Sequence, residues 1–230
     1  MNSDLKPKIK ISEQRRTIGV TGGSVSGLYL FRGSDVIAFE STLERDFLVR
    51  LETFKHVTNV TSQPFTLEYT CSQNKARKYT PDFLVEFDLK IHPYIPPQVI
   101  EVKPRKFIKK KLLAEKDKFK AAFQYCRENA FIFHFMDEER IHDNRFYNAK
   151  FLKRYRQSEI DSKEIESIVD LFKEKPSMLF ENILNTNYLG KRYRSEGIYI
   201  VWSLIAQRVL DCDFNEKINF QTELWLTTDE

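Results

Sequence analysis

The most informative stretch of this chain is Tyr79-Thr80-Pro81-Asp82-Phe83-Leu84-Val85, followed after a proline-bearing loop by Ile100-Glu101-Val102-Lys103-Pro104. Both segments are short and largely apolar, and turn residues border them, so each is predicted to contain a strand. Side chains alternate along a strand, which places Glu101 and Lys103 on one face and apolar residues on the other. The apolar face anchors the strand in a core, and the two charged groups must meet water, a ligand or a metal ion.

Asp82 opens the first of these strands, so its carboxylate is expected beside Glu101 across the sheet. Two carboxylates held close together repel each other, and a divalent cation relieves that repulsion. Oxygen ligands of this kind suit Mg²⁺ or Mn²⁺, and the backbone carbonyl of Val102 is expected to add another. Lys103 is expected to orient water or to stabilise the charge that develops when a phosphodiester is hydrolysed. The pattern therefore predicts a metal-dependent nuclease site.

A third carboxylate is expected from a helix farther upstream. Ser41 or Thr42 can cap a helix that runs to about Lys55, in which apolar residues recur at helical spacing. Glu44 approaches the apolar face of this helix, and a carboxylate there is costly unless it binds something. Glu44 is therefore predicted to join Asp82 and Glu101 as a metal ligand and catalytic residue.

The surroundings of these residues favour a nuclease over a strand start with a surface ion pair, which is the common explanation for a Pro-Asp pair and a Glu-x-Lys tripeptide alone. Residues 1–160 hold 29 basic and 20 acidic residues, whereas residues 161–230 hold 8 and 13. The front of the chain therefore suits a polyanion. Within it, phosphate contacts are predicted for a basic run, although a solvated helix start explains any single lysine equally well. The run consists of Arg105, Lys106, Lys109, Lys110 and Lys111.

Other segments of the first 150 residues give a coarse α/β order of elements. The pattern predicts a hairpin over 28–39, a strand over 57–69 bent at Gln63-Pro64, a polar turn over 71–78, a helix over 109–127 and a buried strand over 130–135. After about residue 137 the pattern changes to amphipathic helices near 146–156, 165–172, 178–184 and 197–210, and then to two short strands within 211–227. We therefore expect a nuclease domain over 1–150 and a helical, winged-helix-like module over 151–230, with the boundary somewhere between 137 and 162.

The segment Phe39-Glu40-Ser41-Thr42-Leu43-Glu44-Arg45-Asp46-Phe47-Leu48 resembles the opening helix of the TnsA family, the endonuclease subunits of heteromeric transposases. Gln63-Pro64 and the two strand segments resemble the same family in the same order, so the likeness covers about residues 28–135. It implies a restriction-endonuclease-like fold, a mixed sheet flanked by helices, with a PD-(D/E)xK site.

By position, the resemblance implies Glu44 as the helix carboxylate, Asp82 as the central metal ligand, Glu101 as a second ligand and Lys103 as the catalytic lysine. Some family members carry Gln at the position of Glu101. Glu40 is a rival to Glu44, which is preferred because it precedes the matching Arg-Asp-Phe-Leu.

The same resemblance implies a substrate and partners. The substrate is double-stranded DNA at transposon ends, of which the nuclease cuts the 5′ strands. A DDE-type transposase that processes the 3′ ends and an AAA+ regulator are the implied partners, with the C-terminal part serving partner contacts. Two alternatives remain open from the residues alone: a restriction or repair endonuclease with the same site, and a non-catalytic DNA-binding adaptor.

The bulk composition sets the class of protein. The chain has 230 residues, of which 41% are hydrophobic and 30% charged, an ordinary globular mixture. No apolar run approaches the length of a membrane span, and residues 1–10 lack the apolar stretch of a signal peptide. Three widely spaced cysteines fit neither a disulfide framework nor a zinc site. A reduced, cytoplasmic bacterial protein is the expectation.

Overall fold

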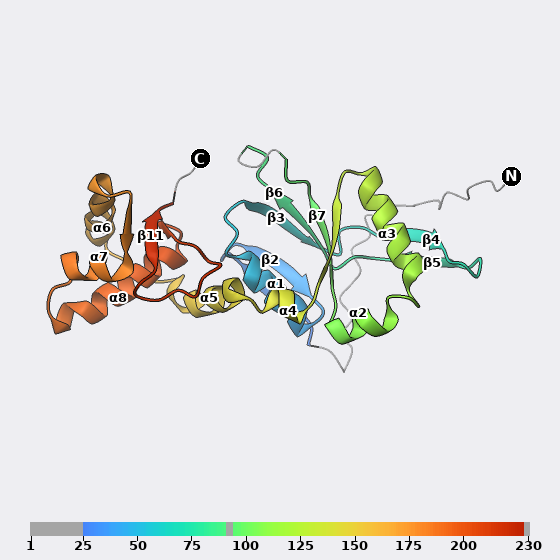
Figure 1. The fold of residues 1–230 in the computed structure, drawn as a ribbon, viewed down its shortest axis with the longest axis horizontal. Helices are drawn as coiled ribbons and strands as arrows, with labels where there is room; N and C mark the ends of the chain where they lie inside the picture. The colour runs from blue at the N-terminus through green and yellow to red at the C-terminus, as the bar shows by residue number, and fades with distance from the viewer. Residues whose placement is uncertain (1–24, 91–93, 228–230) are drawn as a thin grey trace. The chain divides into compact units, whose positions relative to one another are not determined.

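The computed structural model describes residues 25–90 and 94–227, so the expectation about residues 1–10 lies outside the described part. The chain divides into two compact units between Ile141 and His142. Each unit is described by itself below (Figure 1).

The first unit begins with the expected hairpin, formed by β1 (Gly27–Phe31) and β2 (Asp35–Phe39). Its turn contains Gly33 at φ +83°, a conformation that glycine adopts without strain. The expected helix follows as α1 (Thr42–Leu51), with Ser41 as its N-cap. Both predictions are confirmed, although α1 ends four residues earlier than expected.

A four-stranded sheet occupies the centre of this unit. Its strands are β3 (Val57–Ser62), β6 (Phe83–Phe87), β7 (Gln98–Val102) and β8 (Ile132–Met136), in the order β3-β6-β7-β8. The first two pairings are antiparallel, whereas β7 and β8 run parallel. The sheet is therefore mixed.

The strand expected over 57–69 is wrong as a single element. It ends at Ser62, and β4 (Leu67–Thr70) pairs instead with β5 (Ala76–Tyr79) in a separate two-stranded sheet. Pro64 lacks the N–H that would continue the ladder, and Gln63 before it has a left-handed backbone with φ +47°. The polar turn expected over 71–78 is correspondingly shorter, because its second half belongs to β5.

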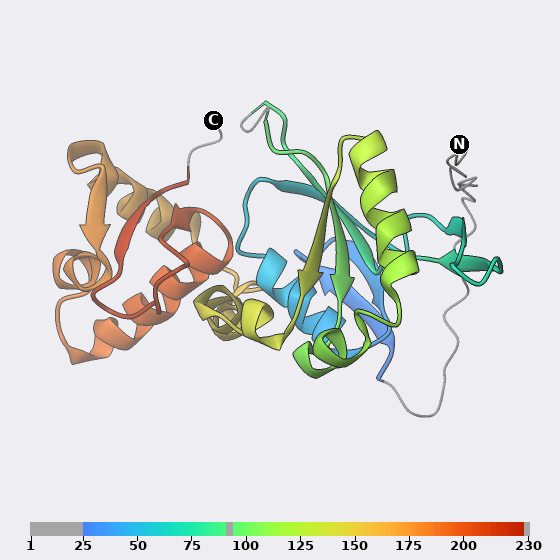
Figure 2. The same cartoon turned by 45° about the vertical axis from the view of Figure 1, so that its right-hand side comes forward.

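Helices cover both faces of the central sheet (Figure 2). On one face α3 (Lys116–Glu128) packs through Phe119 and Ala122 against Val99 of β7 and Phe133 of β8. On the other face the ring of Phe47 in α1 lies 5.6 Å from that of Phe83 in β6. This arrangement confirms the α/β class and agrees with the predicted restriction-endonuclease-like architecture.

The helix expected over 109–127 is two helices. A short helix α2 (Arg105–Lys111) is separated by two residues from the end of β7, and α3 starts after a turn. The four residues 112–115 include no proline or glycine, so no local sequence signal marks this division. A further short helix, α4 (Glu138–Ile141), follows β8 and contacts α1.

The second unit alternates helices with short strands. Its elements are α5 (Asn144–Leu152), a 3₁₀ turn (Lys153–Tyr155), α6 (Ser162–Glu174), β9 (Ser177–Leu179), α7 (Phe180–Asn187), α8 (Lys191–Ala206), β10 (Leu210–Asp211) and β11 (Glu223–Leu226). The three strands form an antiparallel sheet in the order β10-β11-β9. From α6 onward the order is helix, strand, helix, helix, strand, strand; β9 was not foreseen, and the winged-helix-like character of this module stays a prediction.

Helix α5 belongs to the second unit because of Asn148, whose side chain is buried. Its amide donates hydrogen bonds to the carbonyl oxygens of Phe214 at 3.1 Å and Glu216 at 2.7 Å. Its Oδ1 accepts the backbone N–H of Ile218 at 3.2 Å. The boundary between the two units along the chain therefore precedes α5. It lies within the expected interval 137–162 but ahead of the expected position at 150/151.

Helices α7 and α8 cross closely in this unit. A Cβ added to Gly197 in α8 would lie 2.4 Å from the ring of Tyr188, so only glycine fits there. The ring centroids of Phe180 in α7 and Trp202 in α8 lie 4.3 Å apart.

All three cysteines are free thiols, as expected. Among the described helices, none combines the length and the apolar character that a membrane span requires.

Candidate active site

The charged face of β7 lies under α3. Glu101 is 2% exposed there, and Lys103 follows the end of the strand with its side chain 26% exposed. A carboxylate so deeply buried must be paired. The alternation expected for this strand is observed, because Glu101 and Lys103 lie on the same face.

Asp82 lies directly beside them, immediately before β6. Its backbone N–H donates to the carbonyl oxygen of Ile100 at 3.1 Å, which fixes the start of β6 against β7. Its Oδ2 accepts the backbone N–H of Val102 at 2.7 Å. The structure thus brings Asp82, Glu101 and Lys103 together, 21 positions apart at most.

The ammonium of Lys103 lies among three oxygen atoms. Its Nζ is 3.2 Å from Asp82 Oδ2, 3.4 Å from Glu101 Oε1 and 3.1 Å from the carbonyl oxygen of Val102. These are the oxygens expected as metal ligands. They already converge on one cation, which here is the lysine ammonium.

Two residues that sequence reasoning did not single out also hold Glu101. The Tyr79 hydroxyl donates to Glu101 Oε2 at 2.7 Å, and Lys118 Nζ of α3 is 3.5 Å from Glu101 Oε1. Lys118 also pairs with Glu115 at 2.6 Å and lies over the ring of Tyr79. Tyr79 stands three residues before Asp82, and Lys118 is one of several lysines in the helical pattern that follows the basic run, so neither carried a distinguishing sequence signal.

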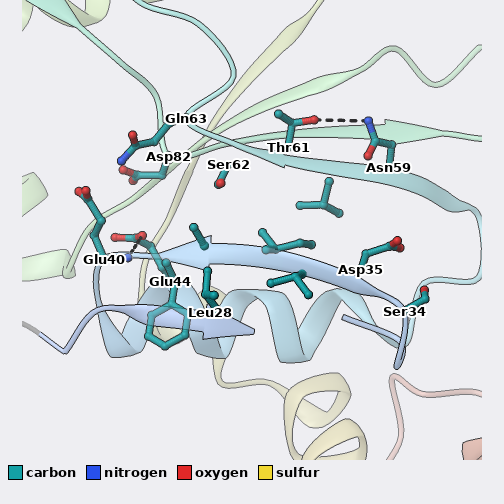
Figure 3. A pocket seen from close by; sticks show the side chains of 15 residues that line it. Leu28, Ser34, Asp35, Glu40, Glu44, Asn59, Thr61, Ser62, Gln63 and Asp82 are labelled. Atoms are coloured by element: carbon teal, nitrogen blue, oxygen red, sulfur yellow. Dashed lines mark hydrogen bonds between the residues drawn. The ribbon is translucent and has the colours of Figure 1, made fainter. Parts of the chain in front are cut away.

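Glu44 approaches the cluster from α1, and it also caps that helix. The Ser41 hydroxyl accepts the Glu44 N–H at 3.2 Å and donates to Glu44 Oε1 at 2.9 Å. The Glu40 N–H donates to Glu44 Oε2 at 2.7 Å, as Figure 3 shows. This arrangement is similar to a capping box with Glu44 as the third helical residue, except that the carboxylate accepts the N–H of Glu40, the residue before the N-cap. The Glu44 carboxylate and Asp82 line the same cavity, and so does Glu40.

Comparison with known families gives this geometry a context. Residues 55–138 match a family model described as "TnsA-like endonuclease N terminal". The chain carries a TnsA-like endonuclease domain. The matched segment contains Asp82, Glu101 and Lys103, whereas Glu44 lies outside it. A comparison with curated proteins found no match.

Two carboxyl groups at this site, those of Asp82 and Glu44, have raised pKa values. Burial, together with the negative charge of Glu101, raises the pKa of Asp82 to about 7, and Lys103 only partly offsets this. Burial also raises the pKa of Glu44, against the hydrogen bonds from Glu40 and Ser41. Burial alone lowers the pKa of the Lys103 ammonium, but the charges of Asp82 and Glu101 outweigh it and the pKa is raised.

These features fit a divalent cation in the TnsA-like domain. The donor atoms are two carboxylates and a backbone carbonyl, which suit Mg²⁺ or Mn²⁺. Burial first, and then the charge of Glu101, raises the pKa of Asp82, and a bound cation would favour the ionised carboxylate. Within residues 25–90 and 94–227, no three His, Cys, Asp or Glu side chains lie close enough together to hold a metal by themselves. The fit therefore depends on the Val102 carbonyl, and Glu44 would have to move toward the cluster to add a third carboxylate.

The basic run of the TnsA-like domain forms α2. Lys106, Lys109 and Lys110 are exposed and make no ion pair with the described residues. Arg105 is different, because its guanidinium pairs with Glu139 and its backbone N–H donates to Glu138 at 2.8 Å. The side chain of Lys111 lies outside the described part. The three exposed lysines remain candidates for phosphate contacts, and Arg105 would first have to leave Glu139.

The raised pKa of Asp82 predicts how stability depends on pH in metal-free protein. Its pKa is near 4 in the unfolded chain and about 7 in the fold, so between these values the folded state binds the extra proton. The contribution of Asp82 to the free energy of unfolding is therefore fully present below pH 4 and is lost as the pH rises through 7. We expect a contribution of about 1–4 kcal/mol from this residue.

Urea unfolding in EDTA at pH 5 and pH 8 measures this effect. Asp82→Asn should lose less stability than the wild type between the two pH values. Equal losses in the two proteins would show that Asp82 titrates normally.

Proposed function

We propose that this protein is a metal-dependent DNA endonuclease that cuts the 5′ strands at transposon ends, as the nuclease subunit of a heteromeric transposase. The observation that carries the proposal is the convergence of Asp82 Oδ2, Glu101 Oε1 and the Val102 carbonyl on the Lys103 ammonium, inside a TnsA-like endonuclease domain.

Asp82, Glu101 and the Val102 carbonyl would hold Mg²⁺ or Mn²⁺, with Glu44 as a further carboxylate. Such an ion supplies Lewis acidity toward the phosphodiester and lowers the pKa of water. The residues of the chain do the rest. The Val102 N–H orients the Asp82 carboxylate, and Tyr79 and Lys118 orient that of Glu101.

Lys103 stays protonated at neutral pH because the neighbouring carboxylates raise its pKa. Its Nζ is therefore an ammonium that orients the attacking water or stabilises charge on the phosphate oxygens as the P–O bond breaks. It cannot act as a general base while these carboxylates remain ionised. With a divalent ion on these carboxylates, the Lys103 ammonium would be free to contact the substrate.

Exposed Lys106, Lys109 and Lys110 of α2 support contact with the DNA backbone next to this cluster, since α2 begins two residues after Lys103. Phosphate contacts position a duplex but do not read its sequence. We therefore assign placement at the transposon end to a DDE-type transposase, under an AAA+ regulator. The winged-helix-like unit is the proposed partner-binding part, because residues 142–230 hold 13 basic and 15 acidic residues and so lack the charge excess of a DNA-binding surface.

Nicking of supercoiled plasmid by the purified protein tests the proposed chemistry. We expect nicks with Mg²⁺ or Mn²⁺, none with EDTA, and no preference for transposon ends in the absence of the transposase. With the transposase present, end-labelled duplexes should show cuts in the 5′ strand at the end. Cutting that persists in EDTA would refute the metal-dependent site. Full sequence-specific cutting by this chain alone would refute the proposal that the transposase places it at the transposon end.

A further inference from the structure

Gln63 has an unusual backbone at the edge of the candidate site. Its φ of +47° lies in the left-handed region, which residues with a side chain rarely adopt. The next residue is Pro64, whose ring favours an extended conformation in the residue before it. The Gln63 N–H nevertheless donates to the carbonyl oxygen of Asp82 at 2.9 Å, which ties this strained residue to the cluster. Strain of this kind is retained mainly where function requires it.

The side chain of Gln63 projects into a cavity of about 500 Å³ between β2 and β3. Figure 3 shows Gln63 at the end of this cavity where Asp82, Glu44 and Glu40 also lie, with Asn59 at the other end. The described lining residues include four carboxylates and no lysine or arginine. A phosphodiester entering at this end would therefore meet acceptors on most sides.

Two neutral side chains at this end, those of Gln63 and Ser62, offer donors without a hydrogen bond to another described residue, and the Gln63 carboxamide is the longer of the two. The Gln63 carboxamide makes no hydrogen bond with the described residues, unlike that of Asn59, which donates to Glu86 at 2.7 Å. An amide N–H can donate to a phosphate oxygen, whereas the neighbouring carboxylates can only accept while they are ionised. Hydrogen-bond donors that are already held at the oxygens where charge develops stabilise the transition state more than flexible donors do.

We propose that the Gln63 carboxamide donates a hydrogen bond to a non-bridging oxygen of the scissile phosphodiester, and that its strained backbone holds it there. This inference rests on the proposed nuclease function and deepens it. It makes Gln63 a substrate-binding residue of the same site.

Three substitutions at Gln63 separate the amide from the backbone. Gln63→Gly relieves the strain and removes the amide, and Gln63→Asn keeps a shorter amide on a residue that tolerates positive φ. Gln63→Glu keeps the shape but replaces the donor with an acceptor. The matched control is Ala130→Gly, because exposed Ala130 also has a positive φ, +56°, but no polar side chain.

Each variant is measured for thermal unfolding, for plasmid nicking with Mg²⁺ or Mn²⁺, and for affinity toward a DNA duplex with Ca²⁺ in place of these ions. We expect both glycine variants to unfold at a higher temperature than the wild type. Gln63→Gly and Gln63→Glu should nick about 100-fold more slowly and bind the duplex more weakly, while Ala130→Gly nicks normally. Gln63→Asn should lie between.

The outcomes distinguish this inference from the proposed function. A wild-type protein that nicks and a Gln63→Gly variant that nicks equally fast would overturn the role of Gln63 alone. Gln63→Glu nicking as fast as the wild type would point to an acceptor, such as a metal ligand, and would also overturn it. If Gln63→Gly unfolds at a lower temperature, the side chain is structural and the inference fails. A wild-type protein that never nicks would end the proposed function itself.

Discussion

Replacing Asp82 with Asn is expected to slow metal-dependent DNA cutting by at least about 1,000-fold, which corresponds to about 4 kcal/mol of transition-state stabilisation. Asn keeps the side-chain oxygen that accepts the Val102 N–H at 2.7 Å, so the join between β6 and β7 is preserved. It removes the negative charge that pairs with Lys103 at 3.2 Å and that would hold a cation. Initial nicking rates at saturating Mn²⁺ measure the effect.

The matched control for this change is Asp88→Asn. Asp88 follows the other end of β6, where its carboxylate accepts the backbone N–H of Lys90 at 2.8 Å, away from the cluster. It should cut at the wild-type rate. Thermal unfolding checks that both variants are folded, and an Asp82→Asn protein that is folded and cuts normally would remove Asp82 from the mechanism.

Replacing Glu44 with Gln is expected to slow cutting by at least about 100-fold, or about 3 kcal/mol in the activation barrier, with little change in stability. Gln is the other residue that completes a capping box, so the contacts with Ser41 and with the Glu40 N–H can persist. Glu44→Ala should lose the charge and the cap together, and should be destabilised by about 0.5–2 kcal/mol. Nicking rates and urea unfolding of both variants make the comparison.

The Gln variant decides between two roles for Glu44. If Glu44→Gln cuts as fast as the wild type, Glu44 serves only to start α1. Glu40→Gln then tests the rival, since Glu40 lines the same cavity. Loss of cutting in Glu40→Gln and not in Glu44→Gln would assign the role of the third carboxylate to Glu40.

Local sequence patterns were sufficient where a short-range rule governs the chain. Ser41 lies three residues before Glu44, and that spacing gives both the start of α1 and the inward carboxylate. Alternation along β7 gave the shared face of Glu101 and Lys103, and the position of Asp82 before β6 followed from its neighbours. The roles of these residues as metal ligands and catalysts stay predictions, because geometry alone does not test them.

Tertiary contacts explain most of what the sequence did not reveal. Tyr79 reaches Glu101 from β5 only because the chain turns away from the central sheet at Gln63-Pro64 and returns as a separate hairpin. Lys118 is distinguished from the neighbouring lysines of α3 only by the placement of this helix over β7. Asn148 looked like part of the first domain until its contacts with residues 214–218 assigned α5 to the second unit.

The central claim is that Asp82, Glu101 and the Val102 carbonyl form a site for a divalent cation. A crystal of the protein grown or soaked with Mn²⁺ and measured at the manganese absorption edge tests it most directly. We predict an anomalous peak with oxygen atoms of all three residues at about 2.0–2.3 Å, and the Lys103 ammonium moved out of the position where it now contacts them. A crystal in which these oxygens are well ordered, Lys103 still lies between them and manganese binds elsewhere or not at all would contradict the account.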